Sequence, residues 1–150
     1  MNLALVDDDH LQADWVRKEL EAGLGDVNIM MINTESEFQS RLEEIAKVQP
    51  AIIIMDVMLR WADPKPGLEL PENKELPRRF RRAGLRCAEL LQTRQDTKNI
   101  PVALYTVLEE SDFGSDLMNA PSTVVHLEKD SRIEPLLDLI RQLTHLRKEL

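Results

Sequence analysis

The chain has 150 residues, of which 43% are hydrophobic and 31% are charged. This is the size and composition of one globular domain with a substantial core, and we expect a single domain over residues 1–150. No run approaches the roughly 20 apolar residues that span a membrane, and the start lacks a secretion signal. We therefore expect a cytoplasmic protein with no membrane partner. The formal net charge of −8 argues against direct nucleic-acid binding, because phosphates would be repelled.

Apolar runs and helical patterns alternate from the start of the chain. Residues 3–6 form a short apolar run before three acids and are predicted to be a buried strand. Apolar side chains then recur at helical spacing over 11–20, and a second apolar run at 27–32 predicts the next strand. Thr34 and Glu37 have the spacing of a capping box, which predicts that the second helix begins there.

The second helix is expected to present one apolar face through Phe38, Leu42 and Ile45. The run that follows at 51–55 is the clearest strand of the chain, because it is β-branched, continuous and ends at Asp56. A strand that is apolar on both faces is typical of a parallel sheet covered on both sides.

The second half of the chain begins with an interruption. Prolines, a glycine and many charges at 60–80 predict an irregular loop. A helical pattern resumes over 84–94, and a strand is predicted at 101–105. A short helix over 112–119 and a fifth strand at 123–127 complete this region.

A last helix is predicted from about residue 131 towards Leu150. Strands that alternate with helices through short connections indicate the α/β class, a doubly wound parallel sheet of five strands. Such sheets bind ligands at the carboxyl ends of their strands. The residues that follow each predicted strand are therefore the candidates for chemistry.

Five polar side chains occupy those strand ends. Asp7 and Asp8 follow the first strand, Asp56 the third, Thr106 the fourth and Lys129 the fifth. Crowded carboxylates require a cation, and Mg²⁺ is the cation that carboxylates and phosphate oxygens hold together. A carboxylate can also act as a nucleophile and form an aspartyl phosphate. An ammonium group and a hydroxyl then suit the oxygens of a phosphoryl group in transfer.

Four segments occur along the chain in a fixed order: Leu-Val-Asp-Asp-Asp, Ile-Ile-Met-Asp-Val-Met-Leu, Val-Ala-Leu-Tyr-Thr and His-Leu-Glu-Lys. In this order they resemble the receiver domains of two-component response regulators, over nearly the whole chain except the loop. The resemblance implies a flavodoxin-like fold, with Asp56 as the phosphorylated aspartate. It implies Asp8 as a direct Mg²⁺ ligand, Asp7 as a ligand through water, and the backbone carbonyl of Met58 as a further ligand.

The resemblance also implies how the signal is transmitted. Thr106 and Lys129 would contact the phosphoryl oxygens, and Thr106 would move towards them. His126 stands at the position on the fifth strand where the family usually has an inward-turning aromatic side chain. The donor would be a histidine kinase or a histidine phosphotransfer protein, and the output a downstream protein effector. Beyond its own phosphorylation and dephosphorylation, no enzyme activity is expected.

Several positions depart from the family pattern. Asp130 stands where a proline usually follows the lysine, and Arg60 where a proline commonly follows the phosphorylated aspartate by four positions. An inserted loop at about 60–82 is longer than usual by about twenty residues, a length uncommon for a structureless loop. The resemblance implies that Met58 and Leu108 stand at the two positions that lie near the path of attacking water in the family, and neither side chain can orient water by a hydrogen bond. We therefore expect slow self-dephosphorylation.

Two other functions fit parts of the sequence. Asp130, Arg60 and the long loop suit a pseudo-receiver, an interaction module that is not phosphorylated. Asp7 and Asp9 satisfy the D-x-D pattern of haloacid-dehalogenase phosphatases, although that interpretation leaves the strand ending at Asp56 unexplained.

The last helix also admits two interpretations, because its leucines recur with heptad-like spacing. Packing against the sheet is one, and a homodimer seam is the other; the repeat is too short to define a coiled coil. The leucines concerned are Leu139, Leu143, Leu146 and Leu150.

Overall fold

The computed structural model describes residues 1–60, 76–113 and 120–148 of the chain. Its centre is a five-stranded parallel sheet with the strand order β2-β1-β3-β4-β5. The expected α/β, doubly wound sheet is therefore confirmed. The strands are β1 (Asn2–Val6), β2 (Asn28–Ile32), β3 (Ile53–Met55), β4 (Val102–Thr106) and β5 (Val124–Glu128).

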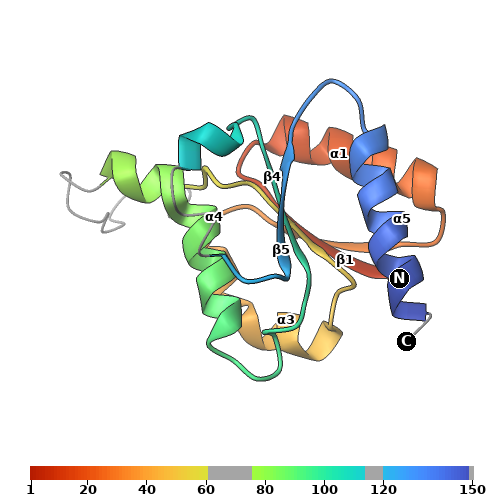
Figure 1. Cartoon of the computed structure of the whole chain (residues 1–150), viewed down its shortest axis with the longest axis horizontal. Coiled ribbons are helices and arrows are strands. Elements are labelled where there is room, and N and C mark those ends of the chain that lie inside the picture. The colour runs from red at the N-terminus through yellow and green to blue at the C-terminus, as the bar shows by residue number, and fades with distance from the viewer. Residues whose placement is uncertain (61–75, 114–119, 149–150) are drawn as a thin grey trace.

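Helices cover both faces of this sheet (Figure 1). Helices α1 and α5 pack on one face, while α2, α3 and α4 pack on the other. Leu139 and Leu143 of α5 pack against the hydrophobic core between the sheet and helices α1 and α5, as expected of a helix that lies on the sheet. The helices are α1 (His10–Leu24), α2 (Glu35–Ser40), α3 (Leu42–Val48), α4 (Leu76–Gln92) and α5 (Glu134–Lys148), with a 3₁₀ turn, η1, at Glu110–Phe113.

Strand β3 shows why its sequence is apolar without interruption. Ile53 and Met55 face the core under α2, α3 and α4, whereas Ile54 faces the core under α1 and α5. All three side chains are fully buried. A central strand covered on both faces has no solvent-exposed position, so it lacks the alternation of a half-buried strand.

The second helix begins as predicted but is shorter. The hydroxyl of Thr34 accepts a hydrogen bond from the amide of Glu37 at 3.1 Å, while the Glu37 carboxylate accepts one from the amide of Asn33 at 3.1 Å. The expected continuous helix through Ile45 is wrong. It is interrupted at Arg41, whose amide donates to Phe38 as well as Glu37 and so tightens the turn.

Helix α4 begins earlier than predicted. Residues 76–82, assigned to the loop at about 60–82, are helical from Leu76 onwards. Pro77 lies in the first turn of this helix, where backbone N–H groups have no acceptor within the helix. The N–H that proline lacks therefore costs no hydrogen bond. The rest of that loop, 61–75, lies outside the described residues, as do 114–119 of the short helix expected at 112–119.

In the part of the chain that the structure describes, no helix combines the length and apolar character needed to cross a membrane.

Gly84 allows α4 to lie directly against the end of β3. Its amide donates to the carbonyl of Val57 at 2.9 Å. A Cβ atom built on Gly84 would stand 2.5 Å from the carbonyl oxygen of Asp56 and 2.6 Å from the Cα of Val57. Those atoms are backbone and cannot move aside, so any side chain at this position would push α4 away from the strand end.

We therefore expect Gly84→Ala to lower the free energy of unfolding by about 1–3 kcal/mol, the usual cost of overpacking. Gly23→Ala is the matched control, because Gly23 is also helical and its Cβ would meet the flexible end of Leu137. Both substitutions gain the same helix propensity. Urea unfolding of both variants measures the difference, and equal stabilities would contradict the close contact.

Candidate functional site

Strand ends meet at one edge of the sheet and carry the predicted residues with them. Asp7 follows β1, Asp56 follows β3, Thr106 is the last residue of β4, and Lys129 follows β5. The backbone ladder continues to this edge, because the amide of Asp56 donates to Val6 at 2.8 Å and the amide of Lys129 donates to Thr106 at 2.7 Å. The sheet therefore fixes the positions from which these side chains extend.

Lys129 joins two of the carboxylates. Its ammonium nitrogen lies 2.9 Å from Oδ2 of Asp7 and 3.1 Å from Oδ2 of Asp56. The Asp7 side chain is 2% exposed and that of Lys129 is 9% exposed. Burial opposes the charge on Lys129, but Asp56 and Asp7 together outweigh it and raise the pKa of the ammonium group. The lysine is therefore positively charged at neutral pH and faces Asp56.

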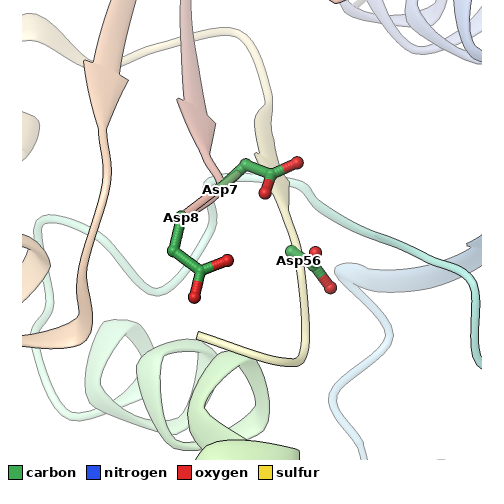
Figure 2. A group of neighbouring side chains, drawn as sticks. All are labelled: Asp7, Asp8 and Asp56. Carbon is green, nitrogen blue, oxygen red and sulfur yellow. The ribbon is translucent and has the colours of Figure 1, made fainter. Parts of the chain in front are cut away.

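Three carboxylates form a candidate metal centre. Asp7, Asp8 and Asp56 each offer one oxygen, and these atoms all lie within 4.8 Å of one another. Figure 2 shows Asp7 and Asp8 at the end of β1, beside Asp56 at the end of β3. Burial is the main reason that the pKa values of Asp7 and Asp8 are raised. Hard oxygen donors of this kind suit Mg²⁺, whose charge would offset the burial of the acids.

Two of these acids, Asp8 and Asp56, border an open cavity of about 400 Å³. Its lining also includes Met58, whose amide donates to Oδ1 of Asp56 at 3.1 Å. This bond fixes one oxygen of the predicted phosphoacceptor, while Lys129 contacts the other. The lining residues are Asp8, Asp9, Gln12, Asp56, Met58, Val107, Lys129 and Asp130.

Asp9 has a structural role at the start of α1. Its side chain accepts a hydrogen bond from the amide of Gln12 at 3.1 Å and so caps α1. The amide of Asp9 in turn donates to Oδ1 of Asp7 at 2.9 Å. The start of α1 therefore holds Asp7 in place, with Oδ2 directed to Lys129.

The two predicted switch residues are connected through Leu108. The Thr106 side chain is buried, and its hydroxyl is 3.4 Å from the Leu108 amide that donates to it. Nε2 of His126 lies 2.9 Å from the carbonyl oxygen of Leu108. The His126 ring also packs edge-to-face on Phe113, with centroids 5.2 Å apart. The backbone of Leu108 thus contacts the side chains of both Thr106 and His126.

The turn after Lys129 has an ordinary backbone. No cis peptide bond occurs within the described ranges, so the bond between Lys129 and Asp130 is trans. The Asp130 carboxylate accepts a hydrogen bond from the Arg132 amide at 2.6 Å, which turns it towards its own loop.

Sequence patterns did not reveal two contacts beside the site. The amide of Arg60 donates to Oδ2 of Asp8 at 3.0 Å. The buried carboxylate of Glu35 binds the guanidinium of Arg86 through two hydrogen bonds of 2.8 and 2.6 Å, which connects α2 to α4. The sequence marked Arg60 only as an unusual residue, and no spacing rule pairs side chains that are 51 positions apart.

Solved structures share this fold over nearly the whole chain. The receiver domain of a DNA-binding response regulator from Colwellia psychrerythraea is 18% identical, with a TM-score of 0.67 over 97% of this chain and 98% of its own. A receiver domain of a two-component histidine kinase from Clostridium thermocellum is 15% identical, with a TM-score of 0.69 over 95% of each chain.

A third structure is the receiver domain of a sensor histidine kinase from Pseudomonas aeruginosa. It is 12% identical, with a TM-score of 0.66 over 95% of each chain, and it holds a magnesium ion in its active-site cleft. No protein-family model and no curated protein matches the chain. The likeness shows the fold: this is the five-stranded, flavodoxin-like α/β fold of receiver domains.

The raised pKa of Asp8 has a consequence for stability. A carboxyl that binds its proton more strongly when folded makes the fold more stable as the pH falls through that raised pKa, and less stable at neutral pH. We expect Asp8→Asn to raise the free energy of unfolding at pH 7, because the neutral amide carries no partly buried charge.

Urea unfolding at pH 7 and pH 5 measures this gain, which should shrink at the lower pH. Asp138→Asn is the control, because Asp138 is exposed on α5. Destabilisation by Asp8→Asn at pH 7 would contradict the assigned direction.

Proposed function

We propose that the chain is a receiver domain that accepts a phosphoryl group on Asp56 from a histidine kinase or a histidine phosphotransfer protein. The observation that carries this proposal is the contact of the Lys129 ammonium with the Asp56 carboxylate at 3.1 Å, beside two further acids. The receiver-domain fold supports it. So does the magnesium ion in the cleft of the Pseudomonas aeruginosa domain.

The residues that would hold Mg²⁺ are Asp7, Asp8 and Asp56, together with the backbone carbonyl of Met58. When bound, Mg²⁺ supplies positive charge to the phosphoryl oxygens during transfer. The donor set of three clustered carboxylates fits this ion, because it needs hard oxygen ligands and keeps several waters. The open cavity beside the acids leaves room for those waters and for a phosphoryl group.

Phosphoryl transfer would proceed by attack of an Asp56 oxygen on phosphorus. The new O–P bond forms as the P–N bond of the donor phosphohistidine breaks, and the electron pair returns to the donor imidazole. The Met58 amide holds Oδ1 of Asp56, and Lys129 offers its ammonium to the phosphoryl oxygens as they arrive. Charge placed in advance at this position lowers the barrier without reorganisation of the site.

Thr106 and His126 would convert this chemistry into a signal. Once a phosphoryl oxygen is present, the Thr106 hydroxyl donates to it and gives up its long contact with the Leu108 amide. The Leu108 carbonyl also contacts His126, so movement of this backbone reaches β5. A downstream protein effector would recognise the altered surface.

A pseudo-receiver is the second candidate, because Arg60 already contacts Asp8. The phosphatase alternative has no such support: Asp9, the second acid of its D-x-D pattern, caps α1 instead.

Incubation with Mg²⁺ and acetyl phosphate separates the receiver from the pseudo-receiver. We expect intact-protein mass spectrometry to detect one added phosphoryl group in the wild type and none in Asp56→Asn. Asp138→Asn keeps the adduct, because this exposed acid of α5 belongs neither to the cavity lining nor to the acid cluster. A wild type without an adduct, or an Asp56→Asn variant that retains it, would refute the proposal.

The lifetime of the aspartyl phosphate is expected to be long. Met58 lies in the cavity wall, and Leu108 follows Thr106 by two positions. Both side chains are apolar, so neither offers a hydrogen bond to an attacking water. We predict that Met58→Asn accelerates self-hydrolysis severalfold, because an amide can orient water, whereas Met58→Leu leaves it slow. Loss of the adduct over time measures both rates, and rapid hydrolysis by the wild type would contradict the prediction.

A further inference from the structure

The contacts of Arg60 point to a role that rests on the proposed function. We infer that the Arg60 guanidinium competes with a divalent metal ion for Asp8, while the Arg60 amide orients that carboxylate. The Arg60 amide donates to Oδ2 of Asp8 at 3.0 Å, and its guanidinium Nε lies 3.6 Å from the same oxygen. The backbone amide and the guanidinium of Arg60 therefore both interact with Oδ2 of Asp8.

Each acid of the candidate metal centre already has a cation beside it. Lys129 contacts Asp7 and Asp56, and Arg60 contacts Asp8. An arriving divalent ion must therefore share or replace the guanidinium partner of Asp8. Positive charge this close opposes the binding of a second cation, and water at the cavity mouth weakens the repulsion without abolishing it.

The two contacts of Arg60 differ in how firmly they are held. Its carbonyl accepts a hydrogen bond from the Glu35 amide at 2.8 Å, and the Glu35 carboxylate is clamped by Arg86 of α4. The backbone of Arg60 is thereby fixed between α2 and Asp8. The guanidinium is attached to a side chain that is 56% exposed, so it can swing into solvent.

These differences separate the two effects. A hydrogen bond from a fixed amide to one carboxylate oxygen is compatible with metal binding through the other oxygen, and it orients the ligand. The guanidinium is a competing charge. A proline at this position would supply neither group, since it lacks the amide proton, whereas alanine would keep the amide and remove only the charge.

Calorimetric titration of Mg²⁺ into the full chain at neutral pH tests this inference. We expect Arg60→Ala and Arg60→Gln to tighten Mg²⁺ binding about three- to tenfold, because each removes one nearby positive charge. Arg60→Pro should bind more weakly than Arg60→Ala, because Asp8 then also loses its orienting bond. Arg94→Ala is the control: Arg94 pairs with Glu43 and Asp96 and precedes β4, at the opposite edge of the sheet.

The outcomes distinguish this inference from the proposed function. Measurable binding with equal affinity in the wild type, Arg60→Ala and Arg60→Gln would overturn the competition and leave the receiver proposal standing. A comparable gain in Arg94→Ala would reduce the effect to net charge and would also overturn it. If no variant binds Mg²⁺ and the wild type takes no phosphoryl group from acetyl phosphate, both proposals fail.

Discussion

The Lys129 ammonium between Asp7 and Asp56 is the contact on which the site depends. Three strand ends, those of β1, β3 and β5, converge on one nitrogen atom through distances of 2.9 and 3.1 Å. Two carboxylates this close repel each other, and the ammonium group between them offsets that repulsion. The lysine keeps the acids in place, and the parallel sheet determines that all three residues emerge at the same edge.

A second constraint holds α4 over this edge. Gly84 brings the helix against the backbone of Asp56, and the Glu35–Arg86 pair connects the same helix to α2. Arg60 connects α2 to Asp8, because its carbonyl accepts a hydrogen bond from the Glu35 amide and its own amide donates to Asp8. Asp56 thus lies in close contact with α4, and Asp8 is connected to α2 through two hydrogen bonds by way of Arg60.

The sheet and the strand-end residues were predictable because both follow from local pattern. Strand β3 is buried on both faces and therefore reads as an unbroken apolar run, and Asp56 and Lys129 simply follow their strands. The contact of Arg60 with Asp8 was not predictable, because it joins residues 52 positions apart through a backbone amide. The early start of α4 was hidden by prolines, which mark loops but also suit a first helical turn. The break at Arg41 depends on a local turn that the apolar spacing does not encode.

Side-chain carboxyl ¹³C NMR tests the central claim most directly, namely that acids from two strands form one site. Mg²⁺ titrated into labelled protein should shift the carboxyl resonances of Asp7, Asp8 and Asp56 along a single binding curve, while Asp138 on α5 stays unchanged. If Asp8 and Asp56 followed separate curves, or shifted no more than Asp138, the acids would not share an ion and the account would be wrong.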